Sequence, residues 1–289
     1  MPLTDFVRYL NAQLPISAFA TRSTSPFVSE GGRVFVYFGD LRLDSDFSPI
    51  VDTASGAILG HAAQLQATKR ERRQPLAHQP LDSESVFRLP NDNEELIFLD
   101  RLVRTLHTLN YLTYGGRRAG GLLLLKVHPR HVAGVADDHG MAFEEILQAC
   151  GLLPKQITLE LEIDGIDDTG HLERAIANYQ RRGYGIALAR LGATEIDFPL
   201  LHKSRPAYVK FDRRRLVSEQ PIKDAIDALH ELGARAIQEG FDTESSRGEA
   251  RENGFDLLQV RAPVRRLIHA STSPVIVSKA QPVDGQVAA

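Results

Sequence analysis

Cysteine and tryptophan are almost missing from this chain. Among 289 residues there is one cysteine, Cys150, and no tryptophan, so an internal disulfide and a cysteine-rich zinc site are both excluded. Long apolar runs are missing as well, because no stretch approaches the roughly 20 residues that cross a bilayer. Residues 1–5 also lack the basic and then apolar order of a signal peptide. These absences predict a cytoplasmic protein that makes no membrane contact.

A strong charge of either sign is missing too. Acidic and basic residues nearly balance, with a formal net charge of -3 at pH 7, so the chain as a whole does not attract nucleic acid. The phosphate-binding GxxxxGK[ST] loop, the GxGxxG fingerprint and the Gly-x-Ser-x-Gly nucleophile elbow do not occur. Their absence disfavours the enzyme classes that depend on them.

What the chain does contain is a series of six short apolar runs. They occupy residues 122–127, 157–163, 185–191, 207–212, 234–239 and 255–260. Short runs of this kind, mostly without alternation, are typical of strands buried on both faces. Helical periodicity followed by a glycine lies between them, at residues 141–150, 171–182 and 221–232. Strands that alternate with helices indicate a parallel sheet, and the predicted fold is an α/β protein, a modified TIM-type barrel.

Polar side chains stand at the carboxyl ends of these runs. In a closed barrel of parallel strands, the active site is built from residues at those ends. The runs therefore predict one functional rim, which would carry Lys126, Glu160, Arg190, Lys210, Asp212, Glu239 and Gln259.

Several short motifs, taken in order, resemble the EAL domain. They are SPIVD at residues 48–52, GHAA at 60–63, LEL at 159–161, VKFD at 209–212, QEGFD at 238–242 and LQ at 258–259. The resemblance extends over roughly residues 44–266. It implies a modified TIM barrel whose active members hydrolyse cyclic di-GMP with two divalent metals. Such chemistry requires several oxygen ligands, carboxylates above all.

By this resemblance, most of the positions that supply metal ligands are changed here. The family's glutamate falls at His61, an asparagine falls at Lys126, and paired aspartates fall at Ala189 and Arg190. An imidazole is a poor ligand for Mg²⁺, and an ammonium group has no lone pair to offer. The positions that remain on pattern are Glu160, Lys210, Glu239 and Gln259, while Asp242 replaces a glutamate. The resemblance therefore implies a lost Mg²⁺ site, no cofactor, and a chain that is not an enzyme.

The predicted rim would also balance its own charge. Three carboxylates would meet three cations there: Glu160, Glu239 and Asp242 against Lys126, Arg190 and Lys210. Because an unpaired buried charge is very costly, we expect these groups to form a self-neutralised salt-bridge cluster. The alternative is a site rebuilt around His61 with another metal.

The resemblance predicts a regulatory protein-interaction module in bacterial cyclic di-GMP signalling, with a protein as its partner. A sensor that binds cyclic di-GMP without hydrolysis is the alternative. Ser48 and Leu65 stand where the family contacts the nucleotide through a glutamine and an arginine, which disfavours that alternative, although the basic side chains of the rim would attract phosphate. An active phosphodiesterase remains only if the alignment at Ala189 and Arg190 is wrong. The partner, the pathway and the oligomeric state stay open.

The remaining segments lie around the predicted barrel. Residues 1–40 are expected to form an N-terminal extension packed on the barrel, residues 41–268 the barrel itself, and residues 269–289 a disordered tail. The polar stretch 66–93 is expected to be irregular, with a helix over residues 94–111 after it. The basic cluster at residues 69–73 is a solvated loop or a docking patch for an acidic partner. The roles of residues 1–40 and 66–93 stay open.

Overall fold

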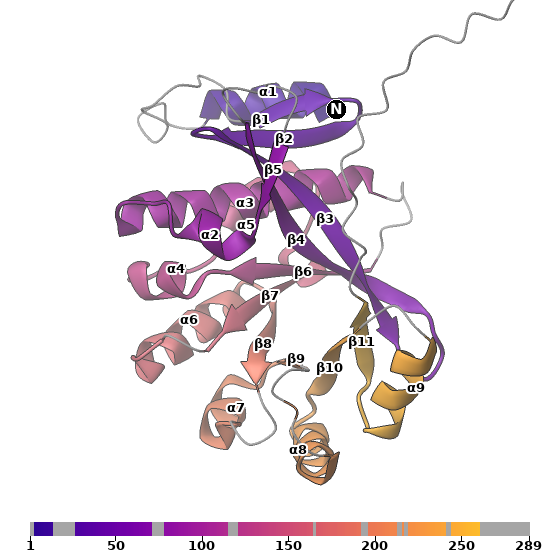
Figure 1. The fold of residues 1–289 in the computed structure, drawn as a ribbon. Coiled ribbons are helices and arrows are strands. Elements are labelled where there is room, and N and C mark those ends of the chain that lie inside the picture. Colours follow the sequence, from indigo (N-terminus) through magenta and orange to yellow (C-terminus); the bar gives the residue numbers. More distant parts are fainter. Residues whose placement is uncertain are drawn as a thin grey trace, which may run out of the picture.

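The chain forms a closed barrel with an added antiparallel layer in this computed structural model (Figure 1). The structure describes residues 3–13, 27–70, 78–114, 121–163, 166–191, 196–212, 216, 219–240 and 244–260. Its strands are β1 Phe27–Glu30, β2 Arg33–Phe38, β3 Leu41–Asp52, β4 Ile58–Arg70, β5 His78–Leu81, β6 Leu122–Val127, β7 Ile157–Glu162, β8 Gly185–Leu191, β9 Tyr208–Phe211, β10 Arg235–Gly240 and β11 Leu257–Val260. Its α-helices are α1 Leu3–Gln13, α2 Ser83–Phe87, α3 Asn93–Thr113, α4 Pro129–Gly134, α5 Met141–Ala149, α6 Thr169–Arg181, α7 Phe198–Ser204, α8 Glu219–Glu231 and α9 Glu244–Glu252.

Eight of the described strands close the barrel. Their order is β3-β11-β10-β9-β8-β7-β6-β4, and the pairing of β4 with β3 completes the ring. Neighbours from β4 round to β11 are parallel, whereas β3 runs antiparallel to both β11 and β4. The long hairpin of β3 and β4 causes this reversal, because a short connection can join only antiparallel strands.

The seam between β4 and β6 depends on a glycine. Gly60 pairs with Leu122 in the parallel ladder, and a Cβ atom at Gly60 would lie 2.1 Å from the carbonyl oxygen of Leu122. No side chain fits at that separation, so the close approach of these two strands requires glycine at this position.

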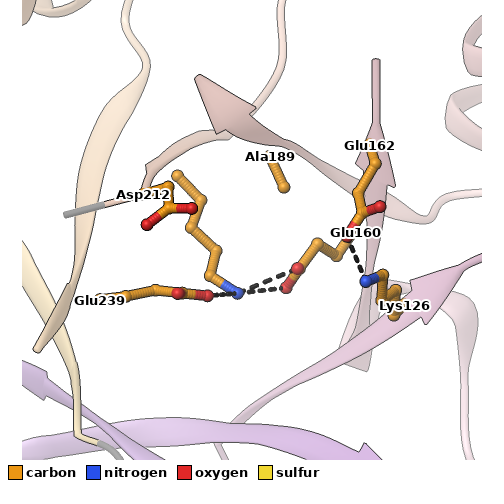
Figure 2. Close-up of a pocket in the computed structure, with 7 residues that line it drawn as sticks. Lys126, Glu160, Glu162, Ala189, Asp212 and Glu239 are labelled. Carbon is orange, nitrogen blue, oxygen red and sulfur yellow. Dashed lines mark hydrogen bonds and ion pairs between the residues drawn. The ribbon is translucent and has the colours of Figure 1, made fainter. Parts of the chain in front are cut away.

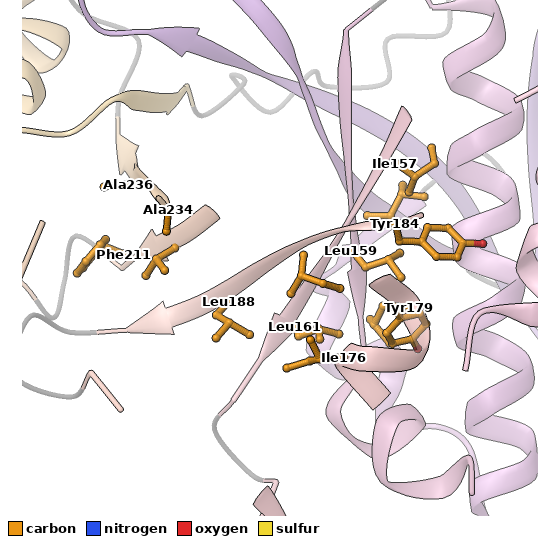
Figure 3. Close-up of a cluster of buried hydrophobic side chains, with 14 of the residues drawn as sticks. Ile157, Leu159, Leu161, Ile176, Tyr179, Tyr184, Leu188, Phe211, Ala234 and Ala236 are labelled. Atoms are coloured by element: carbon orange, nitrogen blue, oxygen red, sulfur yellow. The ribbon is translucent and has the colours of Figure 1, made fainter. Parts of the chain in front are cut away.

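Side chains alternate between the two faces of each barrel strand, which gives the barrel an outer core and an inner core. In β7, Ile157, Leu159 and Leu161 face the helices and join the outer core with Ile176 and Tyr179 of α6 (Figure 3). The inner core is a small cluster in the barrel lumen, formed by Ile50, Ala62, Leu124, Ile237 and Leu257. Because successive side chains point to opposite faces of a sheet, the residues two positions beyond Leu124, Ile237 and Leu257 on the parallel strands point inward as well, toward the carboxyl rim.

The added layer lies at one end of the molecule. Strands β3 and β4 run on past the barrel, where β2 and β1 pair beside β3 and β5 pairs beside β4 (Figure 1). A separate core joins this layer to α1 and α3, and it includes Phe6, Leu10, Val34, Val36 and Leu106. Asn110 of α3 fastens the layer, since its side chain accepts a hydrogen bond from Val34 N at 2.8 Å and donates one to Val34 O at 2.7 Å.

The predicted fold class is confirmed. All six apolar runs are barrel strands, and the predicted helices correspond to α3, α5, α6 and α8. The stretch 66–93 is not simply irregular, because it contains the end of β4, all of β5 and α2. The tail at residues 269–289 and most of the basic cluster at 69–73 lie outside the described residues. The proposed domain boundaries stay a prediction.

No helix in the described part of the chain has both the length and the apolar character needed to cross a membrane.

Candidate functional site

A charged pocket opens at the carboxyl ends of the central barrel strands. Its volume is about 110 Å³, enough for several waters or a phosphate-sized group. Lys126 and Glu239 each lie two residues beyond an inner-core side chain, and Lys210 lies beside Ile237 in the ladder of β9 with β10. Glu160 pairs with Lys126 in the parallel ladder and points inward with it. The lining residues are Lys126, Glu160, Glu162, Ala189, Lys210, Asp212 and Glu239 (Figure 2).

Lys210 on β9 lies at the centre of this pocket. Its Nζ donates to both carboxylate oxygens of Glu160, at 2.9 Å each, and lies 2.7 Å from Oε1 of Glu239. Only 5% of Lys210 and 8% of Glu160 are exposed. Burial opposes the charge of Lys210, but the two carboxylates outweigh burial, so the pKa of Lys210 is held above its ordinary value.

Lys126 on β6 forms the second ion pair of the pocket. Its ammonium group is in close contact with Oε1 of Glu162 on β7. The side chain of Lys126 is 45% exposed, whereas that of Glu162 is 9% exposed. Lys126 therefore presents its charge at the mouth of the pocket, and Lys210 presents its charge within the barrel.

Two polar side chains at motif positions, Ser48 on β3 and Gln259 on β11, are not among the residues that line the pocket. Ser48 is fully buried, and its hydroxyl accepts a hydrogen bond from Nε2 of Gln64 at 2.8 Å. Gln259 is 6% exposed and lies beside Glu239 in the ladder, and its carbonyl oxygen has no hydrogen-bond partner among the described residues. Gln259 thus lies next to a residue of the pocket wall, whereas Ser48 pairs with Gln64.

His61 does not lie in this pocket, contrary to the prediction. Its ring packs on the outer face of the barrel against Tyr111 and Tyr114, with centroids 6.0 and 5.1 Å apart. Burial lowers the pKa of His61. The inward position is the next residue, Ala62, which belongs to the inner core. A shift of one residue along a strand moves a side chain to the opposite face of the sheet. The structure therefore gives no support for a metal site rebuilt around His61.

The other predicted site residues have different outcomes. Glu160, Lys210, Glu239, Lys126 and Ala189 all line the pocket, as expected for a common rim. Two predicted members, the side chains of Arg190 and Asp242, lie outside the described residues. Glu162 was missed, although its place two residues beyond Glu160 puts it on the same face of β7.

The predicted charge balance of three against three is not what the described pocket shows. Four carboxylates and two ammonium groups are among its lining residues. The additional carboxylates belong to Glu162 and Asp212, and both residues make further interactions beyond the pairs given above. Salt bridges therefore dominate the pocket as predicted, but its described lining is richer in carboxylates than expected.

A second ion-pair cluster lies behind the rim, between α3 and α4. Asp100 accepts hydrogen bonds from Arg104 at 2.8 and 3.1 Å, and from His128 N at 3.0 Å. Nδ1 of His131 lies 3.1 Å from Asp100, and its Nε2 lies 3.3 Å from Arg104. Burial lowers the pKa of His131 to about 3, so the ring is neutral. This cluster fixes the chain immediately after β6 and so positions Lys126.

The residues of the rim do not fit a divalent cation as they are arranged. Lys210 holds both oxygens of Glu160 and one of Glu239, and Lys126 holds Glu162. The part of the chain that the structure describes contains no group of three or more His, Cys, Asp or Glu side chains arranged to bind a metal. The absence of an Mg²⁺ cofactor stays a prediction.

Comparison with known proteins gives the family. The chain matches the EAL domain over residues 39–259, which is more than half of its length. The protein therefore belongs to the EAL domain family, and the predicted resemblance is confirmed. No curated protein matches the chain in sequence.

Solved structures share the fold at low identity. The Bacillus subtilis YkuI protein, with an EAL domain, in complex with cyclic di-GMP and calcium, is 18% identical with a TM-score of 0.60 over 75% of this chain and 53% of its own. The PaMucR phosphodiesterase in complex with cyclic di-GMP is 16% identical with a TM-score of 0.62, over 75% and 89% of the two chains. A standalone EAL protein from Vibrio cholerae O395, bound to cyclic di-GMP, is 17% identical with a TM-score of 0.59, over 76% and 90%. The chain spans about half the length of YkuI.

The prediction that the chain is not an enzyme is wrong by these comparisons. Membership of the EAL family and a structural neighbour described as a phosphodiesterase both contradict it. The prediction treated each ligand position separately, whereas the structure gathers Glu160, Lys210 and Glu239 around one pocket. Changed residues at single ligand positions therefore do not establish that activity is lost.

Proposed function

We propose that this chain acts in cyclic di-GMP signalling by binding the dinucleotide at the carboxyl rim of its barrel. The observation that carries the proposal is the charged pocket lined by Lys126, Lys210 and their partner carboxylates. It lies where the ligands of this barrel class bind, at the carboxyl ends of the strands.

In this proposal, the phosphate groups of the ligand first contact Lys126. Lys126 is the half-exposed ammonium group at the mouth of the pocket, while Lys210 is enclosed by Glu160 and Glu239. An ammonium group attracts a phosphate by a charge-assisted hydrogen bond. The structural neighbours that were crystallised with cyclic di-GMP support the choice of ligand.

Calorimetric titration of the full chain with cyclic di-GMP, with and without Mg²⁺, tests the proposal. We expect saturable binding that weakens about tenfold in Lys126→Gln. Chromatography of the nucleotide after each titration shows whether linear dinucleotide forms, which separates hydrolysis from binding alone. Absence of heat under both conditions would overturn the proposal.

A regulatory interaction with a protein is the second candidate, and the added layer favours it. The whole of α1, β1 and β2 precedes the part of the chain that matches the EAL family. This layer exposes two large aromatic side chains, Tyr9 on α1 and Tyr37 on β2, at 48% and 43%. Exposed tyrosines are enriched at protein interfaces.

A paired substitution separates this candidate from nucleotide binding. Tyr9→Glu with Tyr37→Glu should abolish co-purification of a specific partner from the native host and leave cyclic di-GMP titration unchanged. Met141→Glu, which changes an exposed apolar residue on α5, is the matched control. Retention of the partner by the paired variant would exclude the added layer as its contact.

A further inference from the structure

An aromatic stack follows Lys126 at the carboxyl end of β6. The ring of His128 lies nearly parallel to that of Phe87 on α2, with centroids 4.9 Å apart and 27° between the ring planes. The backbone of His128 is extended, and two extended residues span roughly 7 Å. Since side chains alternate along an extended chain, His128 lies on the same side as Lys126, which lines the pocket.

Three contacts hold His128 in place. Its backbone N–H donates to Asp100 at 3.0 Å, and its Nδ1 accepts a hydrogen bond from Arg130 N at 3.2 Å. Phe87 covers one face of the ring, and Phe87 itself packs against the core of the added layer. The ring is therefore positioned before any ligand arrives, which reduces the entropy lost on binding.

The rest of the His128 ring is available to a ligand, because the residue is partly exposed. Burial lowers the pKa of His128, so the ring is neutral at pH 7. Because Nδ1 is an acceptor, the proton of the neutral ring is on Nε2, and Nε2 has no hydrogen-bond partner among the described residues. His128 therefore offers a flat surface and one donor beside the charge of Lys126.

We propose that His128, backed by Phe87, is a stacking platform for one base of the dinucleotide, and that Lys126 contacts the phosphate next to that base. The inference rests on the proposed function and names its base subsite. Aromatic side chains, histidine included, stack on unpaired bases, and every base has a face that accepts such a contact. A nucleotide joins base and phosphate through one sugar, so a separation of two residues between the ring and the ammonium group fits it.

Calorimetric titration of the full chain with cyclic di-GMP tests the platform. His128→Ser removes the ring but keeps a residue that caps a helix well, so the start of α4 is preserved. We expect this variant to bind about tenfold more weakly than the wild type. His128→Phe keeps an aromatic ring and should retain most of the affinity. His202→Ser, on the exposed surface of α7, is the matched control and should bind as the wild type does.

A second measurement detects the stack directly. In the full chain with ¹³C-labelled histidine, the ring signal of His128 is identified by its absence from the NMR spectrum of His128→Ser. Saturating cyclic di-GMP should move this signal upfield, because a base above the ring shields its protons, and the signal of His202 should stay in place. A purely structural role of His128 would not produce this movement.

The outcomes separate this inference from the proposed function. Absence of binding by the wild type would overturn both. Binding by the wild type with equal affinity in His128→Ser, or with an unmoved His128 signal, would overturn the platform alone. An equal loss in His128→Ser and His128→Phe would also overturn it, because the aromatic ring would then contribute nothing.

Discussion

Two buried ion-pair clusters lie on opposite sides of the barrel wall. The outer cluster, Asp100 with Arg104 and His131, joins α3 to α4 outside the strands. The inner cluster, Lys210 with Glu160 and Glu239, lies at the carboxyl rim inside them. Both contain oppositely charged groups within 3 Å of each other, so the geometry of the pairs is similar.

The two clusters differ in their access to solvent. The side chains of Asp100 and Arg104 are both 2% exposed, and the carboxylate also accepts a backbone hydrogen bond from His128. In the inner cluster, the side chain of Glu239 is 45% exposed and borders the pocket. A closed cluster holds the fold together, whereas an open one can exchange a partner with a ligand or an ion. Access to solvent, more than pairing, therefore distinguishes the inner cluster from the outer one.

The largest effect should come from breaking the outer cluster. Asp100→Ala leaves the Arg104 charge buried and removes the acceptor of His128 N, so we expect a loss of about 4 kcal/mol in the free energy of unfolding. Chemical denaturation measures this loss. The paired change Asp100→Leu with Arg104→Met removes both charges and should cost less than Asp100→Ala alone. A single variant within 1 kcal/mol of the wild type, a limit on the order of one weak hydrogen bond, would refute the structural role of the cluster.

A smaller loss should follow from breaking the inner cluster. Lys210→Met leaves Glu160 without its counter-ion, and we expect a cost of about 3 kcal/mol at pH 7, since water can enter through the pocket. A second change, Glu160→Gln, removes the unpaired carboxylate and should recover part of this loss. Chemical denaturation of Lys210→Met with and without Glu160→Gln measures the recovery. An equal deficit in the two variants would contradict this account of the carboxylate.

Much of the barrel could be predicted from local patterns. Six apolar runs of strand length have one dominant interpretation when glycine-terminated helices separate them. The rim residues followed from the ends of the runs, and the period of two explains why Lys126, Glu160 and Glu239 share one face. These features depend on residues near one another in the sequence.

Other features depend on pairings between distant segments, which local patterns do not specify. A slip of one residue in the aligned GHAA motif placed His61 at the rim, and only the ladder of β4 with β3 and β6 shows that Ala62 faces inward. The antiparallel direction of β3 and the layer built on its extension have the same origin. The burial of Asp100 and Arg104 depends on α4 packing against α3, so the pattern within the helix alone does not predict it.

Acid should weaken the outer cluster through His131, and the substitution His131→Gln tests this. Burial lowers the pKa of His131 from 6.5 to about 3, so below pH 6.5 the unfolded chain takes up a proton that the folded chain does not. The stability contributed by neutral His131 is full above pH 6.5 and is lost toward pH 3, at roughly 1.4 kcal/mol per pH unit. His131→Gln should therefore flatten the pH dependence of unfolding by about one proton between pH 4 and 6. The exposed His202→Gln serves as control, and an unchanged slope in His131→Gln would show that His131 titrates normally.

The smallest effect should come from an ion pair that belongs to neither cluster. Lys203 and Glu173 lie 3.0 Å apart, with side chains 65% and 28% exposed. Because solvent screens such a pair and two long side chains lose freedom to form it, we expect Lys203→Met to change the free energy of unfolding by less than about 0.5 kcal/mol. Chemical denaturation at low and high salt measures this change. A loss as large as that of Lys210→Met would mean that pairing itself, and not burial, sets the loss in the free energy of unfolding. The difference between the outer and inner clusters would then need another physical basis.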